Sequence, residues 1–218
     1  MKTASYDFIL PFFVASDELR PAMKQIHSDK NGFLYATNGH MLIKVERDSA
    51  ILKYEEIEKF PNAEAMFERY NFSEKAIIRT DNLVEILSAY KWIRETETEL
   101  CKKCNGTGVI ECEHCNSESD CKECKGKGEF NTGISNLSLL ITDNYYSVVK
   151  VINKLFKADF MHVLAICAKM LEVKEIEVSF NENEYEPHIF KVGDAQILIM
   201  PRQSGSDDFI REIKVKSN

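Results

Sequence analysis

NGFLYATNGHMLIKVE, residues 31–46, carries the clearest signal for β-structure in this chain. It contains two Asn-Gly dipeptides, at 31–32 and 38–39. Asn-Gly tolerates positive φ and is common in the tight turns of β-hairpins. The residues between and after the dipeptides are mostly aromatic, aliphatic or β-branched, which favours strands. The stretch therefore predicts a strand, a turn and a second strand.

The two longest helical patterns lie further along the chain. Over 80–92, Thr80 or Asp81 can cap a helix, and apolar residues recur at helical spacing. Over 157–172, the apolar residues form one continuous stripe. The chain also predicts a short helix within 62–70 and strands over 7–14, 22–28, 134–142, 144–152, 175–180 and 188–201.

These patterns predict an α+β fold. Each long helix is followed by segments that read as antiparallel strands, so we expect helices packed on antiparallel sheets. The strands at 134–142 and 144–152 are expected to pair, and 188–201 is expected to form two strands around a Gly-Asp turn. The polar tail after Pro201 is expected to fray.

Six of the seven cysteines lie within residues 101–124, with the spacing C-x2-C-x7-C-x2-C-x5-C-x2-C. A C-x-x-C turn presents two thiolates to one tetrahedral zinc ion. Glycines follow the second cysteine of the first and third pairs, where the chain must curl past the metal. These glycines are Gly106, Gly108, Gly126 and Gly128. The pattern predicts bound zinc.

The glycines and nearby lysines mark the outer two pairs as one zinc site. Its ligands would be Cys101, Cys104, Cys121 and Cys124. Five lysines lie in or beside these pairs, and positive charge favours ionised thiols. They are Lys102, Lys103, Lys122, Lys125 and Lys127. A four-cysteine site leaves no open position for water, so the zinc would be structural.

The middle pair, Cys112 and Cys115, has several possible roles. It could bind a second zinc with His114 or with a residue of a partner, or remain reduced. It could also share ligands in a six-cysteine cluster.

CKKCNGTG (101–108) and CKECKGKG (121–128) resemble the C-x-x-C-x-G-x-G unit of the DnaJ-type cysteine-rich zinc domain. CEHCNSES (112–119) keeps the cysteines of the unit and lacks its glycines. The resemblance implies a zinc-bound hairpin that contacts protein clients. No His-Pro-Asp tripeptide occurs, so activity on a chaperone ATPase is not implied. The residues on either side, 94–100 and 129–134, are expected to pair as the strands of a hairpin.

The remainder of the chain resembles the bacterial DNA sliding clamp, the β subunit of DNA polymerase III. Arg20-Pro21, Gly32 and ATNGHML (36–42) stand in the order of the clamp's Arg-Pro, glycine turn and Ala-Thr-Asp-Gly-His-Arg-Leu turn. Further similar segments follow in clamp order: 76–87, 143–152, 156–170 and 195–202. Asn38 and Met41 depart from the turn motif.

The two resemblances imply a division of the chain. We expect a discontinuous clamp-like body, residues 1–100 and 130–218, and a DnaJ-type zinc insert, residues 101–129. The clamp resemblance implies a platform for protein or DNA, or both, in DNA replication or repair, and possible homo-oligomers. The alternative is a zinc-stabilised protein-interaction or chaperone-like factor that uses the clamp fold as a scaffold.

Composition and missing motifs argue against several classes of function. The net charge of −7 argues against a broadly basic nucleic-acid binder. The chain has no glycine-rich phosphate loop, nucleophile elbow or HExxH motif, so no enzyme is predicted. It also lacks a signal-peptide pattern and an apolar run of the ~18–20 residues that span a bilayer. We therefore expect a cytoplasmic protein with a protein partner and no small-molecule substrate.

Overall fold

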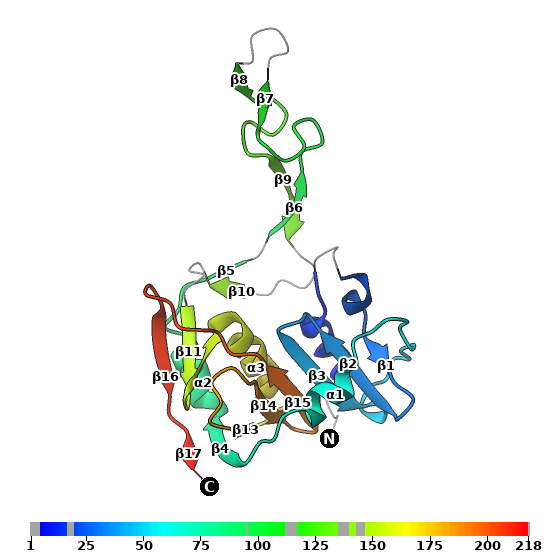
Figure 1. Cartoon of the computed structure of the whole chain (residues 1–218), viewed down its shortest axis with the longest axis vertical. Helices are drawn as coiled ribbons and strands as arrows, with labels where there is room; N and C mark the ends of the chain where they lie inside the picture. Colours follow the sequence, from blue (N-terminus) through cyan, green and yellow to red (C-terminus); the bar gives the residue numbers. More distant parts are fainter. Residues whose placement is uncertain are drawn as a thin grey trace. The chain divides into compact units, whose positions relative to one another are not determined.

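The computed structural model describes residues 5–16, 20–94, 96–111, 117–134, 140–142 and 147–217 (Figure 1). The chain divides into two compact units. The first, here called the body, comprises Met1–Lys91 and Thr142–Asn218, and the second comprises Trp92–Ile141. The predicted insert, 101–129, lies within the second unit, and its independence as a domain stays a prediction.

The main sheet of the body is antiparallel throughout. Among the described residues it has eight strands in the order β1-β2-β3-β15-β14-β13-β4-β17. Their bounds are β1 His27–Ser28, β2 Phe33–Thr37, β3 Met41–Glu46, β4 Glu74–Arg79, β13 Glu175–Phe180, β14 His188–Val192, β15 Ala195–Ile199 and β17 Lys216–Ser217.

The hairpin predicted for 31–46 is confirmed as β2 and β3, paired from Phe33↔Glu46 to Thr37↔Leu42. Its turn is built as the sequence suggests. Gly39 has φ +88°, and the Asn38 side chain accepts hydrogen bonds from the N–H groups of His40 (3.0 Å) and Met41 (2.8 Å). β3 then pairs with β15, which joins the hairpin to the C-terminal half of the body.

A second sheet of the body has the order β12-β11-β16. Its strands are β11 Ser147–Val151, β12 Lys154–Lys157 and β16 Phe209–Ile213. β11 pairs antiparallel with β12 and parallel with β16. The second sheet therefore brings the C-terminal segment beside strands that lie sixty residues earlier in the chain.

Two helices pack between strands of both sheets. α2 (Thr80–Leu87) contacts β4 and β16, while α3 (Ala158–Met170) contacts β11, β12 and β14 (Figure 1). The helices also contact each other. Leu83 of α2 and Met161 and Leu164 of α3 are fully buried and form part of the core with the strands. The α+β fold class with antiparallel sheets is thus confirmed. A shorter helix, α1 (Ala63–Glu68), lies within the predicted 62–70.

Three local predictions are wrong. Residues 7–14 form 3₁₀-helices, Tyr6–Phe8 and Leu10–Phe13, because Pro11 suits the first turn of a helix. A third 3₁₀-helix, Pro21–Lys24, covers the start of the strand expected over 22–28, and only His27–Ser28 at its end forms a strand, β1. The tail after Pro201 is partly ordered as β16 and β17, since strand pairing compensates for its polar composition.

The pairing expected between 134–142 and 144–152 is also wrong for the residues that the structure describes. β10 (Leu140–Thr142) pairs with β5 (Trp92–Arg94), and β11 pairs with β12 and β16. The strands themselves exist, but the partner of each was not readable from the local pattern.

The second unit consists of short antiparallel ribbons. β6 (Thr96–Leu100) pairs with β9 (Glu129–Ile134), which confirms the hairpin predicted from the flanks of the cysteine segment. β7 (Val109–Glu111) pairs with β8 (Glu118–Asp120). No described helix combines the length and apolar composition needed to cross a bilayer.

Candidate metal centre

The four cysteines of the outer pairs come together between these ribbons. Their Sγ atoms all lie within 4.8 Å of one another. Two distances that join the pairs, Cys101 Sγ to Cys121 Sγ and Cys104 Sγ to Cys124 Sγ, are both 3.7 Å. All four side chains are buried, and Ile110 packs against them. The arrangement could hold a metal ion.

The middle pair of cysteines cannot be placed relative to these four sulfurs. Cys112 and Cys115, together with His114, lie outside the described residues. Their predicted role as a second or shared site stays a prediction.

The two C-x-x-C-x-G-x-G segments, 101–108 and 121–128, have the same backbone structure, and we call them the first and second knuckles. In the first, Gly108 N–H donates to Cys104 Sγ at 3.3 Å. In the second, Gly128 N–H donates to Cys124 Sγ at 3.2 Å. An N–H group that points at sulfur stabilises its thiolate form. In each knuckle the N–H of the last glycine therefore stabilises the thiolate of a cysteine that could bind the metal.

The knuckles are also joined to each other by a matched pair of backbone hydrogen bonds. Cys101 N–H donates to Gly128 O, and Cys121 N–H donates to Gly108 O, each at 2.8 Å. The repeat of twenty residues in the sequence therefore becomes an approximate two-fold arrangement around the four sulfurs.

Close packing at the centre explains why glycine is required there. A Cβ at Gly108 would lie 2.3 Å from Gly126 O, and a Cβ at Gly128 would lie 2.3 Å from Gly106 O. All four glycines also have φ between +79° and +84°. Any side chain at Gly108 or Gly128 would push the knuckles apart.

The protonation of the thiols differs between positions. Burial raises the pKa of Cys101 to about 11. At Cys104, burial opposes ionisation, but donation from Gly108 N–H and from the neighbouring thiols outweighs it and lowers the pKa to about 7. A cation among the sulfurs would favour the thiolate form at all four positions.

The lysines predicted to surround the site are all exposed. Lys103 Nζ lies 3.6 Å from a carboxylate oxygen of Glu123, which links the two knuckles at the surface. Lys102 Nζ lies 3.7 Å from Glu99. Exposed pairs of this kind contribute little energy. The paired glutamates also cancel the charge of Lys102 and Lys103, so these two lysines add little positive potential at the sulfurs.

The donor set fits zinc. Four thiolates at Zn–S distances of about 2.3 Å in a tetrahedron have S···S edges of about 3.7–3.8 Å. The two 3.7 Å distances match that edge. Soft sulfur ligands in tetrahedral geometry indicate zinc or an iron–sulfur centre. Four protein ligands complete the shell, so the centre suits a structural ion.

Three further cysteine and histidine residues lie apart from this cluster. Cys167 is buried within α3, and burial raises its pKa. His40 is exposed in the β2–β3 turn, and His188 is fully buried at the start of β14. Among the described residues, only the four cysteines bring together three or more groups able to bind a metal.

Comparison with known proteins identifies a family and finds similar solved structures. A family model described as Conserved hypothetical protein CHP02642 matches residues 41–182. No curated protein matches the chain.

Among solved structures, the chain is similar to the DNA polymerase III β subunit from Borrelia burgdorferi, at 13% identity and a TM-score of 0.49, covering 94% of this chain and 64% of that one. It is also similar to the polymerase sliding clamp from Bacillus subtilis, at 14% identity and a TM-score of 0.49, covering 90% of this chain and 61% of that one. The chain thus spans less than two thirds of the length of these clamps. Both likenesses are at low sequence identity. Neither identifies a DnaJ-type zinc domain, which stays a prediction.

Proposed function

This chain belongs to the family described as conserved hypothetical protein CHP02642, and from that premise we propose that it is a non-catalytic interaction platform whose second unit is held together by one structural zinc ion. The observation that carries the metal assignment is the set of four buried sulfurs within 4.8 Å of one another. The ligands would be Cys101, Cys104, Cys121 and Cys124.

We assign the zinc ion a structural role because few apolar side chains pack around the two knuckles. Ile110 is the one apolar side chain found packed against the cysteines in the described residues. Units with so small an apolar core need a metal, a disulfide or a partner to fold. Zinc binding would therefore supply folding energy for the second unit.

The role of platform is supported by the sequence resemblance to clamps and by the absence of catalytic motifs from the sequence. A protein partner is the first candidate. The outward positions of the helices do not favour DNA: α2 exposes Asp81 and Glu85, and the exposed charge on α3 is Lys169. Non-specific DNA binding requires several cationic side chains aligned on one face.

Elemental analysis of protein purified without added metal tests the zinc assignment. We expect about one zinc per chain, and loss of that zinc in Cys101→Ser and Cys124→Ser. Cys167→Ala is the matched control, since Cys167 lies in α3 and should leave the zinc content unchanged. A zinc content near zero under reducing conditions would refute the assignment. A content near two would assign a further site to Cys112 and Cys115.

DNA as a second partner rests on the sequence resemblance to sliding clamps. Binding to duplex DNA that weakens steeply with salt would support it. If the chain does not bind duplex DNA at low salt, DNA is ruled out as a partner and the proposed partner is a protein. The solution mass completes the test, because a closed ring demands a defined oligomer and a monomeric platform does not. A cytoplasmic location and a role in replication or repair belong to the same proposal and rest on the clamp resemblance.

A further inference from the structure

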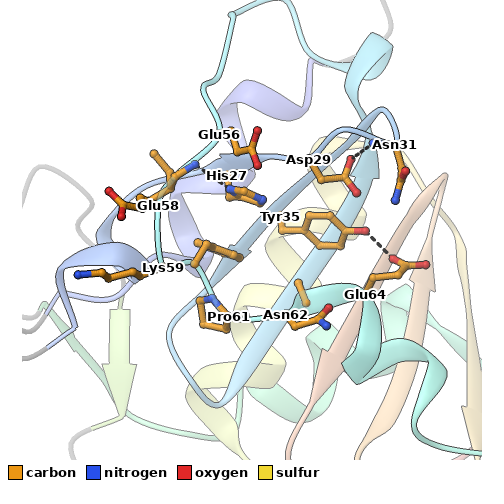
Figure 2. Close-up of a pocket in the computed structure, with 13 residues that line it drawn as sticks. His27, Asp29, Asn31, Tyr35, Glu56, Glu58, Lys59, Pro61, Asn62 and Glu64 are labelled. Carbon is orange, nitrogen blue, oxygen red and sulfur yellow. Dashed lines mark hydrogen bonds between the residues drawn. The ribbon is translucent and has the colours of Figure 1, made fainter.

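The body contains a cavity of about 590 Å³ beside β1 and β2 that is separate from the cysteine centre. Figure 2 shows the residues that line it, which come from β1, the turn before β2, β2 itself and the segment 56–64. Small-molecule and side-chain sites usually have volumes of roughly 300–1,000 Å³. The cavity is thus large enough to take a side chain or a small ligand.

Aromatic rings form one wall of the cavity. The His27 imidazole stacks on the Phe60 ring, with centroids 4.6 Å apart and planes 8° from parallel. Tyr35 lies next to His27, with centroids 6.4 Å apart. Flat rings of this kind favour a planar group or a cation.

His27 is fixed in orientation and charge. Its Nδ1 accepts a hydrogen bond from Ile57 N–H at 2.9 Å, so in the neutral ring the proton sits on Nε2. Burial lowers the pKa of His27, against the opposing effect of Asp29 and Glu56. The ring is therefore neutral at pH 7, and it does not cancel the two nearby carboxylates.

The carboxylates that line the cavity differ in how far other groups of the protein already bind them. We call a carboxylate committed when a protein cation bonds to it, and available when it could accept hydrogen bonds from a ligand. Glu64 is committed, because it accepts from Tyr35 Oη at 2.5 Å and from Lys44 Nζ at 2.6 and 2.7 Å. Asp29 is held rigidly, since Oδ1 accepts from the N–H groups of Asn31 and Phe33. These two N–H groups offset part of its negative charge, and the Arg47 guanidinium donates to the backbone carbonyl of Asp29.

Glu56 is the second available carboxylate. Its carboxylate lies 3.5 Å from Lys30 Nζ, and the Glu56 and Lys30 side chains are 57% and 80% exposed. Such a pair contributes little and is easily displaced. In Figure 2 the carboxylates of Glu56 and Asp29 both lie near His27, while the Lys59 side chain extends away from it. The cavity thus presents negative charge next to flat rings.

This chemistry selects among ligands. Phosphate-bearing ligands are disfavoured by the carboxylates. A metal ion is disfavoured because, within the described part of the chain, the cysteines alone gather three metal-binding groups. A guanidinium group is planar, always charged and able to donate several hydrogen bonds to carboxylates while it stacks on rings. An ammonium group offers the charge without the planarity.

We propose that the cavity binds a guanidinium group, presented as an arginine side chain of a protein partner. The proposal rests on the proposed platform function in that it requires a protein partner, but it does not involve the metal. The guanidinium donates to the Asp29 and Glu56 carboxylates and lies against the half-buried ring of His27.

NMR titration of the zinc-loaded full chain with three blocked tripeptides tests this. The probes are Gly-Arg-Gly, Gly-Lys-Gly and the neutral analogue with citrulline in place of arginine. We expect the arginine probe to shift the resonances of Ser28, Tyr35 and Ile57, with millimolar affinity. The lysine probe should bind several-fold more weakly, and the citrulline probe should not bind.

Matched variants locate the interaction. Glu56→Gln should weaken arginine binding about fivefold. Glu55→Gln is the control, because Glu55 is equally exposed and does not line the cavity; it should change the affinity less than twofold. Equal binding of arginine and citrulline probes, shifts confined to other residues, or equal affinities in the two variants would each overturn the proposal.

The test of the guanidinium site can fail or succeed independently of the test of the zinc assignment. Protein with one zinc per chain that fails to bind the arginine probe would refute the guanidinium site alone. Protein without zinc that still binds the probe would refute the zinc assignment alone.

Discussion

At the scale of single residues, Gly108 and His188 show how strongly one position can be constrained. Gly108 has φ +79° and faces the carbonyl of Gly126 across the centre. His188 is fully buried among Phe156, Phe180 and Phe190, and neither ring nitrogen has a hydrogen-bond partner within the described part of the chain. The first position tolerates no side chain, and the second tolerates no charge.

Gly108→Ala should weaken zinc binding at least tenfold, because the new Cβ would lie 2.3 Å from Gly126 O. Gly106→Ala is the matched control in the same knuckle. Its φ is similar, at +84°, but its Cβ would meet the flexible end of Leu100 at 3.1 Å. Chelator competition measures both affinities. Similar losses in the two variants would mean that positive φ, and not the close approach, makes glycine necessary.

The buried His188 predicts a loss of stability in acid. Burial, with a smaller effect from Lys154, lowers the pKa of His188 from 6.5 to about 3. Above pH 6.5 the ring is neutral in both states, and the full free energy of unfolding is present. As the pH falls from 6.5 toward 3, the unfolded chain binds a proton that the folded chain excludes. The free energy of unfolding should fall by up to about 4 kcal/mol over this range from His188.

Urea unfolding as a function of pH measures this, with His188→Phe as the comparison. The variant keeps an aromatic ring and loses the titration, so its free energy of unfolding should fall less steeply between pH 6.5 and pH 3. Identical slopes for the two proteins would show that other groups, such as His27 and His162, cause the acid sensitivity.

At the scale of elements, β16 departs most from expectation. Its five residues combine three apolar side chains with Arg211 and Glu212, and so short and mixed a pattern does not indicate a strand. In the structure β16 pairs in parallel with β11 over five residues, and Ile213 inserts into the core at 2% exposure. The partner strand was distant in the chain, so local reading could not supply it.

Ile213→Ala should therefore lower the free energy of unfolding by about 2–4 kcal/mol, as for other buried Ile→Ala changes. Ile210→Ala in the same strand is the control, since Ile210 is 46% exposed; it should cost less than about 1 kcal/mol. Urea denaturation compares the two. Equal small effects would indicate that β16 is not docked in solution.

At the scale of the whole molecule, the two units are stabilised by different means. The body buries many apolar side chains between two sheets and two helices. The described part of the second unit has ribbons and a cysteine cluster with one packed apolar residue. The units should therefore respond differently to metal removal.

A strong zinc chelator should collapse the NMR dispersion of residues 101–111 and 117–128 and leave the resonances of the body in place. Restoring zinc should restore the dispersion, because ligand binding is coupled to folding of the second unit. If both units lost their dispersion together, the metal would be stabilising the body as well. If neither changed, the knuckles would be held by their backbone hydrogen bonds.

The sequence determined the features that are encoded within a few residues. Asn38-Gly39 specified the β2–β3 turn, apolar spacing specified α2 and α3, and the repeated C-x-x-C-x-G-x-G specified the two knuckles and the cysteines that meet. Each follows from short-range geometry, such as positive φ at glycine or helical periodicity.

The three-dimensional structure was needed for every feature that joins distant segments. It placed β16 beside β11 and made the two knuckles pack as an approximate two-fold pair. It also assembled the cavity from His27, Tyr35 and the segment 56–64. These contacts gain their energy from burial and pairing between segments far apart in the chain, which leave no periodic pattern in the residues themselves.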